Sequence, residues 1–149
     1  MTPPPRGFNT NAHETSEMRM KLPTKLLGKF GEWWAEWFYR LRGYIVVAKN
    51  ARSTYGEIDL VLRRGRTLVI AEVKTRQSRT AGEGVDAVTR HKRDRLIRLG
   101  HRFAANHPDT QLRYDIISNF WTGWRFVVSH YADAFQPLVD AQRPWVLRG

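Results

Sequence analysis

Two short segments of the sequence place carboxylates and a lysine where they could hold a metal ion. One is Gly56-Glu57-Ile58-Asp59-Leu60, and the other, after a short polar turn, is Ala71-Glu72-Val73-Lys74-Thr75-Arg76. Because strand side chains alternate with period two, Glu72 and Lys74 point to one face of their strand. Asp59 and Glu72 lie at similar distances from the turn, so antiparallel pairing brings the two carboxylates together.

Neighbouring carboxylates need a counter-charge. At about 4 Å and an effective dielectric near 20 they repel each other by about 4 kcal/mol. A cation, a proton or Lys74 offsets this repulsion, and a hard divalent cation such as Mg²⁺ (or Mn²⁺) suits oxygen ligands beside phosphates. Such an ion polarises a scissile phosphate and lowers the pKa of a bound water. Lys74 adds positive charge near the attacking water or the developing pentavalent phosphate.

A solvated surface strand is the alternative explanation for Glu72 and Lys74 taken alone. Their neighbours favour a buried strand instead, where charges are costly and usually mark a site: Val69, Ile70, Ala71 and Val73. We therefore predict Asp59 and Glu72 as metal ligands, and both of them together with Lys74 as catalytic residues.

A helix is predicted to begin at Thr24, as a candidate cap, and to run to about Arg42, with Gly43 as its C′ residue. Glu32 lies on a flank of small residues that lets another backbone approach, so it is predicted as a third metal ligand or a general base. Large apolar residues recur at helical spacing and predict a buried stripe, widened by Trp34 and Phe38: Leu26, Phe30, Trp33, Trp37 and Leu41.

Five strands are predicted in an α/β protein. Tyr44 to Ala48 is an apolar run typical of a covered strand. Glu57 to Leu62 and Leu68 to Lys74 form a hairpin through Arg64-Gly65-Arg66. Leu112 to Ile117 and Trp124 to Ser129 follow, joined around Gly123.

A second helix, from about Asp86 to Asn106, lies between the third and fourth strands. Its outer faces carry five arginines, and its inner stripe includes Lys92, which either reaches the site and contacts substrate or snorkels to the surface. Arg52 and Arg76 either clamp phosphate or pair with the site carboxylates. We predict Arg52, Arg76 and Lys92 as nucleic-acid contacts, and Glu57 as a structural partner of Arg52 or Arg76 rather than a metal ligand.

Composition favours a single domain with a polyanionic partner. The chain has 149 residues, a net charge of +11 from 25 Lys and Arg against 14 Asp and Glu, and no cysteine. We expect an unstructured leader over 1–22, one domain over 23–136 and an irregular tail over 137–149. With neither a signal-peptide pattern nor a membrane-spanning run, a cytoplasmic protein is expected. Zinc–thiolate sites and cysteine nucleophiles are excluded.

Taken together, these motifs resemble a known family. Asp59 followed by Glu72-x-Lys74 resembles the core of the PD-(D/E)xK nuclease superfamily, with Ile58 in place of the proline. Over about 28–135 the chain looks like the YraN-like family of predicted bacterial endonucleases. The matching motifs are Gly31-Glu32, Asn50-Ala51-Arg52, Gly56 to Leu60, Glu72 to Arg76, and Arg113-Tyr114-Asp115, where Tyr114 replaces the family's Phe.

This resemblance implies a restriction-endonuclease-like fold, with a mixed sheet of about five strands flanked by helices. It also implies similarity to archaeal Holliday-junction resolvases, from which Glu32, Asp59, Glu72 and Lys74 carry over as the catalytic set. Those resolvases are dimers, because a junction offers two-fold symmetry, so a homodimer is an open expectation here.

Three functions compete at this stage. The first is a metal-dependent endonuclease acting on DNA, including branched or structured DNA. The second is a nucleic-acid-binding module that keeps the nuclease fold without turnover, based on the Arg-rich helix and the charge of +11. The third is a protein-interaction domain that docks through the Trp-rich helix, an idea that full burial of Trp33 and Trp37 would remove.

Overall fold

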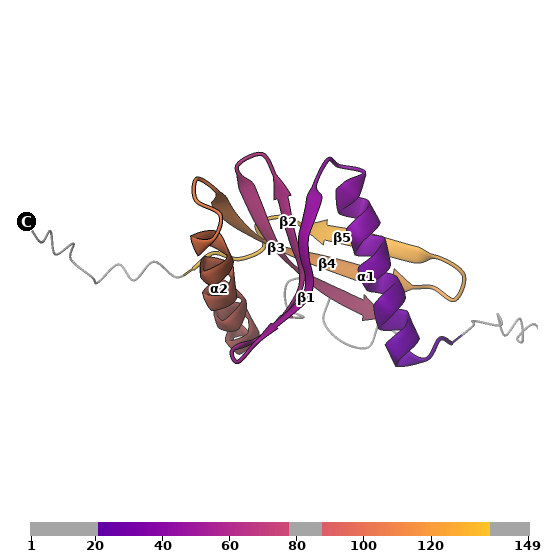
Figure 1. Ribbon diagram of the computed structural model, residues 1–149. Helices are drawn as coiled ribbons and strands as arrows, with labels where there is room; N and C mark the ends of the chain where they lie inside the picture. Colours follow the sequence, from indigo (N-terminus) through magenta and orange to yellow (C-terminus); the bar gives the residue numbers. More distant parts are fainter. Residues whose placement is uncertain (1–20, 78–87, 138–149) are drawn as a thin grey trace, which may run out of the picture.

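The structure is a computed structural model in which residues 21–77 and 88–137 are described (Figure 1). The predicted leader and tail therefore lie almost wholly outside the described residues, as does the predicted start of the second helix near Asp86. The elements in chain order are α1 (Thr24–Arg40), β1 (Ile45–Ser53), β2 (Gly56–Arg64), β3 (Thr67–Arg76), α2 (Arg90–Ala105), β4 (Gln111–Trp121) and β5 (Phe126–Tyr131).

The five strands form one mixed sheet in the order β1-β2-β3-β4-β5. β1, β2 and β3 form an antiparallel meander, β3 pairs with β4 in parallel, and β5 returns antiparallel to β4. A parallel pair needs a crossover connection, and α2 lies within the one that joins β3 to β4. The predicted α/β class and the mixed five-stranded sheet flanked by helices are confirmed, in agreement with a restriction-endonuclease-like fold.

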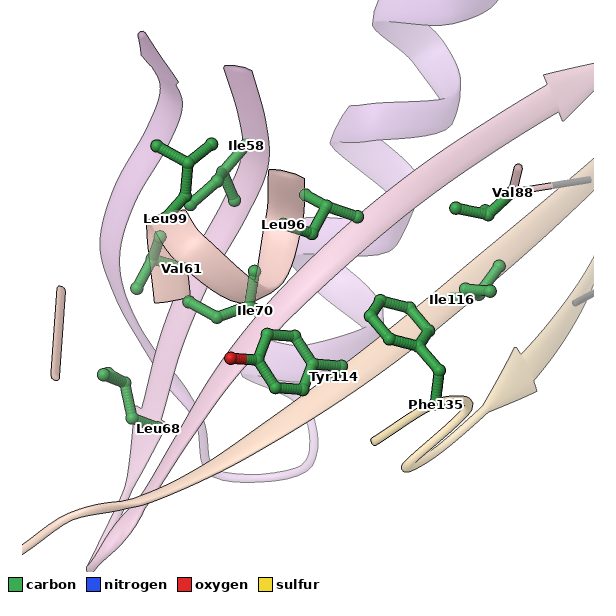
Figure 2. Close-up of a cluster of buried hydrophobic side chains, with 10 residues drawn as sticks. All are labelled: Ile58, Val61, Leu68, Ile70, Val88, Leu96, Leu99, Tyr114, Ile116 and Phe135. Atoms are coloured by element: carbon green, nitrogen blue, oxygen red, sulfur yellow. The ribbon is translucent and has the colours of Figure 1, made fainter. Parts of the chain in front are cut away.

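The two helices pack on opposite faces of the sheet. On β3, Leu68 and Ile70 belong to a core with Leu96 and Leu99 of α2 (Figure 2). The alternate residues Val69 and Ala71 belong to a second core with Ala35 and Tyr39 of α1. A strand covered on both faces reads as a continuous apolar run, and this explains the sequence of β3.

The hairpin register that the sequence predicted is confirmed. Arg64 pairs with Thr67 across a two-residue turn, and the pairing continues to Leu60 opposite Ala71. Beyond the last pair, the Asp59 side chain accepts a hydrogen bond from the backbone N–H of Val73 and lies within reach of the charge of Glu72. The two segments that carry the candidate chemistry therefore meet in the middle of the sheet.

The prediction for the buried face of α1 was wrong. The residues of α1 that are buried are Leu27, Gly31, Ala35 and Tyr39. Trp33, Trp34 and Trp37, predicted as core, are 43–52% exposed. The reason is steric: a Cβ added at Gly31 would lie only 1.8 Å from Thr75 Oγ1 on β3, so at Gly31, midway along its buried face, the helix lies too close to the sheet for any side chain. The small-residue flank, rather than the aromatic stripe, faces the core.

Several element boundaries also differ from those predicted. β1 continues to Ser53 and is an edge strand with much of its surface exposed, not a covered strand ending at Ala48. Thr24 is the first helical residue rather than a side-chain cap. In contrast, Gly43 follows α1 with a φ of +81°, as expected of a C′ glycine.

The later elements are shifted as well. α2 begins at Arg90, with the side chain of Thr89 accepting a hydrogen bond from the Lys92 backbone N–H. β4 is longer than predicted and extends to Trp121, and β5 begins at Phe126 rather than Trp124. Polar residues in strands, which the sequence pattern penalises, account for these misplaced ends. No helix among the described residues is long and apolar enough to cross a bilayer.

Candidate functional site

Glu72 is the centre of the candidate site. It lies on the α2 side of β3, in the same alternation as Leu68 and Ile70, and is only 1% exposed. Its Oε1 atom lies 3.0 Å from Lys74 Nζ and also contacts Lys92 Nζ. Its Oε2 atom is buried without a hydrogen-bond partner among the described residues. A buried carboxylate oxygen without a donor is costly, so Glu72 is only half satisfied.

Asp59 is the second carboxylate of the site. Its Oδ2 atom accepts a hydrogen bond of 2.7 Å from the backbone N–H of Val73, which replaces a ladder bond beyond the last β2–β3 pair. Burial, followed by the negative charge of Glu72, raises the pKa of Asp59 to about 7. The predicted pair of neighbouring, mutually repelling carboxylates is therefore present in the fold.

Two lysines bring the counter-charge. Lys74 reaches Glu72 along β3, while Lys92 reaches it from the first turn of α2. Burial alone would lower the pKa of Lys92, but the hydrogen bond to Glu72 and the charges of Glu72 and Asp59 raise it. Of the two alternatives for Lys92, the structure shows the one in which it reaches the site.

Glu32 lies near the pair but not within it. Its Oε2 atom accepts a hydrogen bond of 3.2 Å from Asn50 Nδ2 on β1, and its charge contributes least among the causes that raise the pKa of Asp59. Across residues 21–77 and 88–137, no three His, Cys, Asp or Glu side chains are arranged to hold a metal ion. The structure thus brings together Asp59, Glu72 and Lys74 of the predicted set and leaves Glu32 at a margin.

The residues present fit a hard divalent cation at the Asp59–Glu72 pair. The Oε2 atom of Glu72, which has no partner within the described residues, offers a negative oxygen, and Asp59 supplies another whose ionisation a nearby positive charge would favour. Oxygen donors of this kind are the ligands that Mg²⁺ and Mn²⁺ prefer. Lys92 occupies one side of Glu72, so a cation would compete with its ammonium group for this carboxylate.

The predicted phosphate contacts lie on the surface. Arg52 bonds to Glu57 at 3.2 Å, which confirms the structural partner predicted for Glu57. Arg52 also borders a hollow of about 390 Å³, together with Arg102 of α2. Arg76 is half-buried at the end of β3. The outer side of α2 is basic, with exposed arginines at Arg90, Arg95, Arg98 and Arg102.

A second buried carboxylate, Asp115, lies on the α1 face of the sheet. It accepts two hydrogen bonds from Arg113, and Tyr39 Oη and the backbone N–H of Asp133 also donate to it. His130 Nε2 lies 2.8 Å from it. Burial alone would raise the pKa of Asp115, but these partners lower it to about 2. Asp115 is therefore a structural partner of Arg113.

Sequence reasoning missed two polar residues that position α1. Asn50 takes a left-handed φ of +48° and holds Glu32. Asn119 is fully buried, and its Nδ2 atom donates to the carbonyl of Gly31 at 2.9 Å. Asn50 was visible as part of the Asn-x-Arg motif, since Asn tolerates this conformation. No pattern in the sequence singled out Asn119.

The fold and the site define an α/β protein whose mixed sheet holds two carboxylates and a lysine beneath a basic helix that adds a second lysine. The chain belongs to the uncharacterised protein family UPF0102, whose family model matches residues 31–118. This confirms the YraN-like resemblance, and the matched span includes Glu32, Asp59, Glu72 and Lys74.

Relatives support this membership over most of their own length. A UPF0102 protein of Parafrankia sp. (strain EAN1pec) is 44% identical, over 62% of this chain and 80% of the relative. One of Nocardia farcinica is 40% identical, over 73% and 88%. One of Parvibaculum lavamentivorans is 34% identical, over 89% and 98%. Their names state the family alone, so the activity has to be argued from the site.

Proposed function

We propose that this protein is a metal-dependent endonuclease that hydrolyses phosphodiester bonds in DNA, including branched or otherwise structured DNA. The observation that carries the proposal is the buried Glu72 carboxylate, which has one oxygen without a partner in the described part of the chain, beside an Asp59 whose pKa is raised to about 7. Titratable groups perturbed by burial and by a like charge are concentrated at functional sites.

Each residue has a distinct role in this proposal. Asp59 and Glu72 would hold Mg²⁺ or Mn²⁺, which polarises the scissile phosphate and acidifies a water molecule when bound. Lys74 places its ammonium group where it can orient the attacking water and offset charge that develops on the phosphate. Glu32, which accepts a hydrogen bond from Asn50, would act as a general base or as an outer ligand of the metal ion.

The charge distribution supports a nucleic-acid substrate. The net charge of +11 favours a polyanion, because each neutralised phosphate releases condensed counterions. The exposed arginines of α2 lie on the helix that also sends Lys92 to Glu72. A duplex held along α2 by Arg52, Arg76 and these arginines would have its backbone near the site.

Cleavage of labelled linear, flapped and four-way DNA with Mg²⁺ or Mn²⁺ tests the proposal. We expect cleavage to fall by about 10²-fold or more in Asp59→Asn and Lys74→Met, because each removes a group that acts on the reacting phosphate. Lys49→Met is a matched control, since Lys49 pairs with Glu36 on the surface. Absence of cleavage on every substrate, or undiminished cleavage by both site variants, contradicts the proposal.

A non-catalytic nucleic-acid-binding module is the second candidate. The observation that favours it is that Glu72 already pairs with two ammonium groups, those of Lys74 and Lys92. Binding that weakens steeply with salt, is unchanged in Asp59→Asn and is indifferent to Mg²⁺ supports this candidate over the nuclease. An affinity that does not depend on salt counts against both.

A further inference from the structure

α1 presents a continuous apolar face to the outside of the molecule. Six large apolar side chains of the helix and its C-cap are 42–79% exposed, and the sequence pattern had placed them in the core: Leu26, Phe30, Trp33, Trp34, Trp37 and Leu41. We call these six residues the α1 face. Exposed patches of this kind mark interaction sites, because a monomer in water gains nothing from keeping them. The α1 face therefore needs an occupant.

The shape of the α1 face suits another helix. Leu26, Phe30, Trp33 and Trp37 are separated by four, three and four residues, the alternation that lets two helices interdigitate along a shared seam. A hollow of about 270 Å³ lies at the N-terminal half of this face, lined by Leu26, Lys29, Phe30 and Trp33. Trp37 and Leu41 lie along the C-terminal half, so the same face offers both a hollow and side chains that could enter one.

Because the α1 face carries both a hollow and protruding side chains, it is complementary to itself when two copies of the helix pack antiparallel. We propose that the α1 face binds the α1 face of a second copy of this chain, antiparallel, with the two-fold axis near Trp33. Trp37 of each copy then enters the hollow of the other. This is an isologous contact, in which one patch serves both subunits and the assembly closes at two.

The available area approaches that of a standard dimer interface. From the exposed fractions of the six residues and side-chain areas of about 150–250 Å², the face offers roughly 600–700 Å² per copy. A standard interface needs about 800 Å² per partner, and the flanking stems of Lys25 and Lys29 supply more. Aromatic pairs continue the patch from Trp34 to Phe126 of β5.

The α1 face is separate from the candidate active site. α1 packs on one face of the sheet, whereas Glu72 and Lys92 meet on the other, under α2. The dimer therefore leaves both sites open, and it rests on the exposed residues of α1 rather than on the proposed nuclease activity. Its failure and the failure of that activity are separate results.

The mass of the full-length protein in solution tests the proposal. We expect light scattering during gel filtration to give twice the chain mass of 17.4 kDa. Trp33→Glu and Trp37→Glu should each weaken self-association at least about thirtyfold, as for a central aromatic anchor. Tyr55→Glu is the matched control, because Tyr55 is 54% exposed, close to the 52% of Trp33, but lies on the β1–β2 turn.

Directed cross-linking gives a second measurement that does not depend on weakening the dimer. The chain has no cysteine, so a single Trp33→Cys substitution near the proposed axis should yield a disulfide-linked dimer on mild oxidation, and Tyr55→Cys should not. A monomeric wild-type protein at micromolar concentration overturns the proposal, since the face is then covered by the chain's own ends or by another protein. A dimer that persists in both Trp→Glu variants also overturns it.

Discussion

Two buried acidic clusters lie one residue apart in the sheet and differ in almost every physical respect. Asp115 of β4 pairs with Ala71 of β3, and Glu72 is the next residue along. Asp115 faces α1, where side chains and a backbone N–H surround both of its oxygens and hold its pKa at about 2. Glu72 faces α2, has one oxygen without a partner within residues 21–77 and 88–137, and lies near Asp59, whose pKa is raised to about 7.

Asp115 is a carboxylate that stabilises the folded state, whereas the burial of Asp59 and Glu72 is unfavourable. Buried polar groups are almost always satisfied, and Asp115 follows this rule with donors from α1, β4 and the segment after β5. Glu72 does not, because its Oε2 atom has no hydrogen-bond partner among the described residues. Asp59 has one donor, but burial and the charge of Glu72 still raise its pKa, so a cation at this pair would stabilise the folded protein. The same residue type in the same sheet therefore has opposite consequences for unfolding and for binding.

The largest expected effect is on stability. Asp115→Asn should lower the free energy of unfolding at pH 7 by about 3 kcal/mol, because it leaves Arg113 and other donors without their charged acceptor. Asp59→Asn makes the same chemical change but should alter stability by less than about 1 kcal/mol, since a carboxyl group with a pKa near 7 is already half protonated there. Urea denaturation of both variants measures this, and equal losses would remove the distinction between the clusters.

The next effect concerns metal addition. At free Mn²⁺ of about 100 times the Kd, wild-type protein should gain about 2.7 kcal/mol and about 5–10 °C in Tm. Asp59→Asn should lose this gain, whereas Asp115→Asn should keep it despite its lower starting Tm. Differential scanning calorimetry with and without Mn²⁺ checks the shifts, and removal of the ion with EDTA should reverse them. A Tm shift that is unchanged in Asp59→Asn would show that the cation binds elsewhere.

A pH effect of about 2 kcal/mol is expected from Asp115. Its folded-state pKa of about 2 lies below the unfolded value of about 3.9, so its contribution is present above pH 4 and is lost as the pH falls towards 2. The difference in unfolding free energy between wild type and Asp115→Asn should therefore shrink by about 2 kcal/mol over this window. A difference that stays constant from pH 5 to pH 2 would contradict the assignment.

The smallest expected effect is on the affinity for Mn²⁺, and it tests the role of Lys92. Lys92→Met removes the ammonium group that now contacts Glu72, so Mn²⁺ should bind several-fold more tightly, equivalent to about 1 kcal/mol. Lys49→Met, which breaks a surface pair with Glu36, serves as the control and should leave the Kd unchanged. Isothermal titration calorimetry measures both, and weaker binding in Lys92→Met would show that this lysine supports the cation instead of competing with it.

Much of the site was predictable because it depends on local strand geometry. A short turn fixes the register of the β2–β3 hairpin as far as Leu60 opposite Ala71, which brings the next residues, Asp59 and Glu72, to the same end of the hairpin. The Arg113–Asp115 pair is equally local, two residues apart on one strand. Contacts between distant elements, such as Lys92 with Glu72, depend on how α2 docks, so the sequence left that alternative open.

Which side of α1 packs on the sheet could not be predicted from hydrophobicity. The aromatic stripe has the stronger apolar character, but hydrophobicity indicates which side chains avoid water and not which neighbour covers them. The contact with the sheet is decided by size instead, through Gly31 against Thr75 and Asn119. β1 was underestimated for a similar reason: as an edge strand it tolerates polar residues such as Lys49 and Arg52, which weaken any apolar pattern.

The parallel pairing of β3 with β4 has a kinetic consequence. β1, β2 and β3 pair through short turns, so this meander can form early from contacts close in sequence. The β3–β4 ladder instead joins Thr67 to Gln111 and needs α2 in place between them. Loop closure over such a distance is slow. We therefore expect refolding to be limited by the docking of α2 and β4, the step that finally shuts Glu72 away from water.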